Sequence, residues 1–282
     1  MSQALMPLLA LFGGMFSIQF GASIAKKLFP LVGIYGATTL RLFLASFILL
    51  IIWRPWRAKL DFKAYKAIII YGIALGMMNL LFYLSLGRIP LGIAVALEFT
   101  GPLAVAIFHS RKLVDFIWAL LAVVGMYLLL PLAGQSNLDL TGIAYALGAG
   151  FCWAMYILYG QKAGKDLHAG IVTSLGMFVA ALIVTPFFII FSETRTFPLE
   201  TLPLAFLVAI LSSALPYSLE MIALKRIPAK TFGILMSLEP AIAAMMGFLF
   251  LHENLDTTQL IAILCIIAAS LGGTLTARMK KN

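Results

Sequence analysis

Four charged side chains lie deep inside long apolar segments of this sequence: Arg41, Glu98, Glu220 and Glu239. A carboxylic acid in apolar surroundings can take up and release a proton, and a guanidinium group can hold a carboxylate through two parallel hydrogen bonds. A charge in a lipid-like setting costs roughly 2.5–3.5 kcal/mol, so such residues are functional candidates by default. The chemistry that they suggest is proton transfer or the binding of a small charged molecule.

Glu98 stands beside a predicted break in its helix. Thr100, Gly101 and Pro102 follow it closely. Proline donates no backbone hydrogen bond, and the ring of Pro102 crowds the carbonyl four residues earlier, which belongs to Glu98 itself. Gly101 adds bare backbone, which is typical where irregular backbone lines a cavity. Glu98 therefore offers a carboxyl group and a freed carbonyl oxygen, either for a function such as proton coupling or for a structural contact.

Arg41 is the predicted partner of Glu98. At 1.5 Å per residue, both lie about 10–12 Å below the same surface, counted from Pro90 for Glu98 and from the start of the second apolar segment for Arg41. Arginine stays charged at any relevant pH. The sequence leaves three roles open for Arg41: it neutralises Glu98, it holds a substrate carboxylate, or the pair only makes membrane insertion tolerable.

The second half of the chain carries two more acids. Glu239 immediately precedes Pro240, which is a second predicted helix break. It lies about 16 Å from the opposite surface, near the middle of its segment. Glu220 lies five residues before Lys225, so its side chain could instead reach along the helix toward the polar boundary. Glu239 is thus the stronger candidate of the two.

Uncharged polar and aromatic side chains occur in the same segments. They could hydrogen-bond a small polar solute or hold an ammonium group by cation–π contact, and each could equally serve packing. The candidates are Gln19, Asn79, Tyr83, Trp153 and Tyr217. The three histidines lie at segment ends and form no ligand cluster, so we expect neither a metal nor a cofactor.

Composition identifies the setting of these residues. The sequence is 62% hydrophobic and 11% charged, with a mean hydropathy of +1.04, whereas soluble domains are about 45–50% apolar and about 25% charged. This predicts an integral protein of a lipid bilayer. The formal charge of +9 then concerns membrane orientation, and no separate basic domain suggests nucleic acid as a partner. No Gly-rich phosphate loop, H-E-x-x-H or G-x-S-x-G motif is present, so we expect no enzyme activity.

Ten apolar runs are long enough to span a bilayer as helices. The fold class expected from them is an all-α polytopic membrane protein with ten transmembrane helices and short loops. The predicted spans are 4–24, 34–53, 66–86, 91–109, 114–132, 141–160, 170–191, 203–223, 231–251 and 257–277.

An internal repeat divides these spans into two halves. Residues 88–102 read RIPLGIAVALEFTGP and residues 226–240 read RIPAKTFGILMSLEP, with an offset of 138 positions. Because five spans separate the copies, the two halves enter the membrane in opposite directions. We therefore predict two inverted five-helix repeats, residues 4–132 and 141–277, with a binding site near the midplane between them, as in alternating-access transporters.

The lysines and arginines indicate the orientation of the spans. Basic residues cluster in segments 54–66, 111–112, 162–165, 225–230 and 278–281, which the predicted topology places on one side. Cytoplasmic loops carry an excess of lysine and arginine. Both termini are therefore predicted to be cytoplasmic.

Several longer runs resemble the EamA-type carriers of the drug/metabolite transporter superfamily. These runs are residues 29–33 (FPLVG), 38–42 (TTLRL), 90–106 (PLGIAVALEFTGPLAVA), 214–224 (ALPYSLEMIAL) and 231–241 (TFGILMSLEPA). The resemblance covers essentially the whole chain and implies the ten-helix EamA architecture. It also implies export of small amino acids, threonine and homoserine among them, from the cytoplasm across the bacterial inner membrane, driven by the proton gradient.

A zwitterionic amino acid needs a cation for its carboxylate and an anion or an aromatic face for its ammonium group. Arg41 and Glu98 could supply these, with Glu98 exchanging a proton for the substrate. The sequence leaves alternatives open, namely an exporter of a different metabolite or drug, or a passive channel. It also leaves open whether the protein forms a homodimer.

Overall fold

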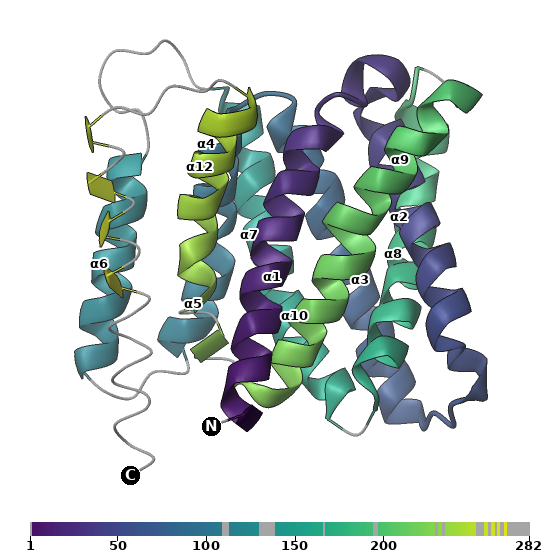
Figure 1. Ribbon diagram of the computed structural model, residues 1–282, viewed down its shortest axis with the longest axis horizontal. Coiled ribbons are helices and arrows are strands. Elements are labelled where there is room, and N and C mark those ends of the chain that lie inside the picture. The colour runs from purple at the N-terminus through teal and green to yellow at the C-terminus, as the bar shows by residue number, and fades with distance from the viewer. Residues whose placement is uncertain are drawn as a thin grey trace.

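The computed structural model describes residues 2–108, 113–129, 139–165, 167–193, 197–228, 231–232 and 235–251, with short pieces at 257–258, 261–262, 264–265 and 268–269. Regular secondary structure in these residues is helical throughout. The helices stand side by side as a bundle, with α6 at one end of the long axis and α2, α8 and α9 toward the other (Figure 1).

The helical elements follow one another with short connections. The α-helices are α1 (Ser2–Ala25), α2 (Phe29–Trp53), α3 (Phe62–Leu86), α4 (Leu91–Glu98), α5 (Thr100–Phe108), α6 (Leu113–Leu129), α7 (Leu140–Gly164), α8 (Ala169–Phe191), α9 (Leu202–Ala209), α10 (Leu215–Arg226) and α12 (Glu239–Leu251). The shorter elements are the 3-10 turns η1 (Pro55–Arg57), η2 (Leu199–Thr201) and η4 (Met236–Leu238), and the π-helical turn η3 (Ile210–Ala214).

Within the described residues, six helical segments are long and apolar enough to cross a bilayer, and shorter apolar helices accompany them. The prediction of an all-helical, multi-pass membrane protein is confirmed to this extent. The tenth predicted span, 257–277, lies mostly outside the described residues, so the count of ten stays a prediction. The second helix begins at Phe29, earlier than predicted, because the chain stays helical on both sides of a kink at Gly33, where φ is 69°.

Small residues allow the helices to approach closely, as lipid-embedded bundles require. A Cβ atom on Gly72 of α3 would lie 2.8 Å from the carbonyl oxygen of Gly176 in α8, and one on Gly76 would lie 2.9 Å from that of Ala180. Helix α3 also packs along α7, while α1 packs along α10 and α12, and α4 packs on α12. These contacts bring both halves of the chain together around a common centre.

The fourth predicted span is broken one turn earlier than expected. Helix α4 ends at Glu98 and α5 begins at Thr100, so Gly101 and Pro102 lie in the first turn of α5. The backbone bond from Leu103 N to the carbonyl of Phe99, at 3.1 Å, carries the chain through the break. The ninth span is interrupted similarly: the 3-10 turn η4 ends immediately before α12, whose second residue is Pro240.

Replacing Gly101 with alanine is expected to lower the free energy of unfolding by about 1–3 kcal/mol, the usual cost of overpacking. A Cβ atom at this position would lie 1.9 Å from the carbonyl oxygen of Gly150, which is backbone and cannot swing aside. Thermal unfolding in detergent measures the effect, with Gly92→Ala as the matched control. A Cβ atom on Gly92 would meet its nearest atoms at 3.6 Å, an ordinary contact. Equal melting temperatures for the two variants would contradict this tight α5–α7 approach.

Candidate functional site

All four charged residues from the apolar segments line one buried pocket. They come from α2, α4, α10 and α12, and their exposed fractions are between 2% and 7%. The full lining is Ile18, Gln19, Ala22, Arg41, Met78, Asn79, Phe82, Glu98, Trp153, Tyr217, Glu220 and Glu239. Residues more than 200 positions apart in the sequence therefore share one cavity.

The pocket is narrow in this conformation. Its cavity volume is about 30 Å³, which is about the volume that one molecule takes up in liquid water. The cavity therefore has room for water but not for an amino acid. A larger solute requires the surrounding helices to separate.

Arg41 is held by neutral groups. Its Nη1 donates to the carbonyl oxygen of Ser212 at 3.2 Å and to Oγ of the same residue at 3.1 Å, and its Nη2 donates to Oδ1 of Asn79. The guanidinium carbon lies 4.2 Å from the centre of the Tyr83 ring, a cation–π contact. Among the described residues, Arg41 has no ion pair, and its Nε has no hydrogen-bond partner. A positive charge without a protein counter-ion in contact thus faces the pocket.

A proline in the eighth span explains how α10 and its preceding π turn reach Arg41. Pro216 has no backbone N–H, so it donates neither the α-helical bond to Ser212 nor the π-helical bond to Leu211. Both freed carbonyls accept from other helices: that of Ser212 from Arg41, and that of Leu211 from Oγ of Ser17 at 2.6 Å. The break in hydrogen bonding therefore attaches α1 and α2 to this span.

The three glutamates occupy the other part of the pocket. Oε2 of Glu220 accepts from the Tyr156 hydroxyl at 3.0 Å, and Oε1 of Glu239 accepts from Nε2 of Gln19 at 2.9 Å. Oε2 of Glu239 has no partner among the described residues. Glu220 does not reach for the polar boundary, since it is 2% exposed and faces the pocket. Three acids and one base in a single cavity cannot all be charged without strong repulsion, unless protons or a cation join them.

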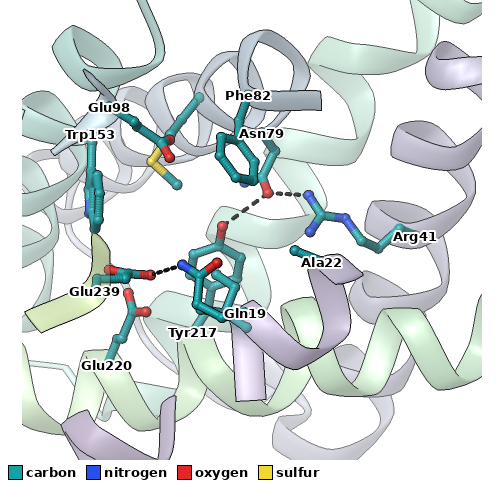
Figure 2. A pocket seen from close by; sticks show the side chains of 12 residues that line it. Gln19, Ala22, Arg41, Asn79, Phe82, Glu98, Trp153, Tyr217, Glu220 and Glu239 are labelled. Carbon is teal, nitrogen blue, oxygen red and sulfur yellow. Dashed lines mark hydrogen bonds between the residues drawn. The ribbon is translucent and has the colours of Figure 1, made fainter. Parts of the chain in front are cut away.

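Asn79 and Tyr217 connect the two parts. Oδ1 of Asn79 accepts from Arg41 and, at 3.0 Å, from the Tyr217 hydroxyl, while Nδ2 donates to the carbonyl of Leu75 at 2.8 Å. Figure 2 shows Arg41 at one side, Glu98, Glu220 and Glu239 at the other, and Tyr217 and Gln19 between them. The pocket is thus divided into a basic side and an acidic side.

Most residues predicted from the sequence meet in this pocket. Tyr83 does not line it and instead supports Arg41 from outside, and the expected pairing of Arg41 with Glu98 is not a direct ion pair. Sequence reasoning missed Ser212, although a proline four residues later in an apolar span was a usable signal. It also missed the apolar lining of Ile18, Ala22, Met78 and Phe82, which carries no signal beyond its closeness to Gln19 and Asn79.

The sequence matches those of a class of membrane carriers. Residues 140–274 match the EamA-like transporter family. The chain is 54% identical over 274 residues to the "Threonine/homoserine exporter RhtA" of Salmonella typhimurium (strain LT2), covering 97% of this chain and 92% of the relative. It is 54% identical over 278 residues to the protein of the same name from Escherichia coli (strain K12), covering 98% and 94%.

The fold is also found among solved structures. One crystal structure superimposes with a TM-score of 0.74 at 17% sequence identity, covering 97% of this chain and 99% of that chain.

The sequence matches show that the chain belongs to the EamA-like transporter family, and the predicted resemblance to EamA-type carriers is confirmed. These relatives are transporters, which agrees with the expectation that the protein is not an enzyme.

Proposed function

We propose that the protein exports threonine and homoserine from the cytoplasm across the bacterial inner membrane by proton antiport. The observation that carries this proposal is the 54% identity, over nearly the full length of both chains, to proteins named as threonine/homoserine exporters. The proposed range includes other small amino acids, because they share the carboxylate and ammonium groups of threonine and homoserine and differ from them only in the side chain.

The divided pocket supports an amino-acid substrate. A zwitterion carries a carboxylate and an ammonium group close together, and the pocket sets Arg41 opposite three carboxyl groups (Figure 2). The guanidinium group would hold the carboxylate, and an ionised glutamate would hold the ammonium. A channel for uncharged solutes would have no need for either group, and burying each has a cost.

The packing supports two inverted repeats, residues 4–132 and 141–277. Exchanging the halves converts the contact of α3 with α7 into that of α1 with α10, and both contacts are present. Asn79 and Tyr217, which align at the repeat offset of 138, hydrogen-bond to each other. Their contact would lie on the pseudo-twofold axis, at the midplane where such transporters bind substrate. With both termini cytoplasmic, α3 and α8 would begin on the cytoplasmic side.

Proton coupling would pass through Glu98. This residue lines the pocket, is 7% exposed, and forms no ion pair among the described residues. Protonated from outside, Glu98 would release the ammonium group; deprotonated toward the cytoplasm, it would bind the next one. Export and proton entry would then be linked by competition for a single carboxylate.

Uptake into inverted membrane vesicles tests the proposed function. Vesicles containing the protein are expected to accumulate labelled threonine and homoserine at least about fivefold over protein-free vesicles when the interior is acidic, and to lose this accumulation when an uncoupler dissipates the gradient. Equilibration that is insensitive to the uncoupler would instead indicate a passive channel. Absence of uptake for both amino acids, with accumulation of another compound, would indicate an exporter of a different metabolite.

A further inference from the structure

Gln19 carries an unused hydrogen-bond acceptor in the middle of the pocket. Its side chain is 3% exposed, and Oε1 has no hydrogen-bond partner among the described residues. A buried amide oxygen without a hydrogen-bond partner lowers the stability of the protein, because it has lost its bonds to water and gained none in return. Such an atom in a binding pocket points to a ligand group that completes it.

The orientation of this amide is set by its neighbour. Nε2 of Gln19 donates to Oε1 of Glu239 at 2.9 Å. Oε1 of Glu239 is the acceptor in this hydrogen bond, so the amide turns its NH₂ group toward Glu239. The amide oxygen of Gln19 then remains without a partner. Because it can only accept hydrogen bonds, only a donor group in the pocket can satisfy it.

Three lining residues have buried polar atoms without a partner among the described residues: Arg41, Glu239 and Gln19. Arg41 is on the basic side, where it could bind the carboxylate of an amino acid. Glu239 is on the acidic side, where it could bind the ammonium group. Gln19 is uncharged and lies between them (Figure 2). Its free oxygen is therefore available to the part of a bound amino acid that is neither carboxylate nor ammonium, which is the side chain.

We propose that Oε1 of Gln19 accepts a hydrogen bond from the side-chain hydroxyl of the exported amino acid and so selects hydroxylated substrates. The inference rests on the proposed export of threonine and homoserine. These two carry their hydroxyl on neighbouring carbon atoms, and removing it from either one gives the same compound, 2-aminobutyrate. One acceptor beside the side chain can serve both, whereas 2-aminobutyrate leaves Gln19 unsatisfied. A site built to bind a hydroxyl rejects the analogue that lacks it, because its own polar group is then left unpaired.

Competition measurements test this inference. Unlabelled threonine, homoserine, 2-aminobutyrate and valine compete with labelled threonine in inverted vesicles, valine being the methyl analogue of threonine in shape. For the wild type we expect inhibition constants for 2-aminobutyrate and valine at least about tenfold above that for threonine. Gln19→Met, which keeps the length of the side chain but has no amide oxygen, is expected to bring the threonine and 2-aminobutyrate constants within about twofold of each other while 2-aminobutyrate is still transported.

The matched control is Gln161→Met. Gln161 is a partly buried glutamine whose Nε2 donates to the carbonyl of Ile227 at 3.3 Å, and it does not line the pocket. This variant is expected to keep the wild-type preference. Ligand-induced thermal stabilisation of the purified protein, with the same four compounds, gives a second readout that does not require transport.

The outcomes separate the inference from the proposed function. A wild-type preference retained in Gln19→Met would overturn the role of Gln19. Loss of binding to both threonine and 2-aminobutyrate in a Gln19→Met protein with an unchanged melting temperature would also overturn it, because the amide would then serve more than the hydroxyl. Wild-type protein that handles all four compounds alike would overturn hydroxyl selection and leave amino-acid export standing. Wild-type protein that neither binds nor transports any of them would overturn the proposed function itself.

Discussion

Threonine uptake by inverted vesicles is expected to fall by at least about 100-fold in the variant Arg41→Lys, which corresponds to about 2.7 kcal/mol of lost binding and transition-state stabilisation. Lysine retains the positive charge, so a role that needs only charge would survive the change. The guanidinium group, however, donates hydrogen bonds to both Ser212 and Asn79 and lies over the Tyr83 ring. A lysine ammonium has neither the planar fork nor the reach to satisfy these partners and a substrate carboxylate together.

Stability distinguishes this role from a structural one. Arg41 is a buried charge without an ion pair among the described residues, so removing it relieves a desolvation cost while leaving Ser212 and Asn79 with fewer partners. These effects oppose each other, and we expect the melting temperature of Arg41→Met to stay within about 5 °C of the wild type.

The control for Arg41→Lys is Arg88→Lys, because Arg88 lies half exposed in a loop, where its Nη1 pairs with Asp139 at 2.6 Å. Arg41→Lys protein that transports at more than about a third of the wild-type rate would contradict substrate binding by the guanidinium group.

The second large effect is expected for Glu98→Gln. The substitution preserves size and hydrogen-bonding capacity but removes the exchangeable proton, so accumulation driven by the gradient should fall to the protein-free level, at least about fivefold below the wild type. Exchange of labelled for unlabelled threonine at equal pH on both sides should persist in part, because Arg41 and two other carboxyl groups remain in the pocket. The measurement is uptake with and without an acidic interior, compared with exchange in the same vesicles.

Three variants show whether this coupling belongs to Glu98 alone. Glu200→Gln, at an exposed position in η2, is the control and should behave as the wild type. Glu220→Gln and Glu239→Gln change the other two acids of the pocket. Gradient-driven accumulation that survives in Glu98→Gln but is lost in one of these would move the coupling site to that residue, and Glu98 would then be a structural acid.

The class of the protein and its candidate residues could be predicted from the sequence. Membrane insertion depends on hydrophobicity summed over about 20 neighbouring residues, which is a one-dimensional property. The cost of a buried charge is similarly local, so Arg41, Glu98, Glu220 and Glu239 could be identified without a fold. The rise of 1.5 Å per residue also indicated that Arg41 and Glu98 lie at a common depth, and both line the same pocket.

Only the tertiary structure decided which of these groups touch. Depth along a helix does not define the direction in which a side chain points, because the rotation of each helix about its axis is set by packing against its neighbours. Arg41 therefore reaches Ser212, on a segment 171 positions away, and does not form the expected ion pair with Glu98. Tyr83 likewise lies behind the guanidinium group instead of in the pocket. The partner of Arg41 became available because Pro216 leaves a carbonyl unbonded, and an unbonded carbonyl in an apolar bundle is satisfied by whichever donor the packing brings beside it.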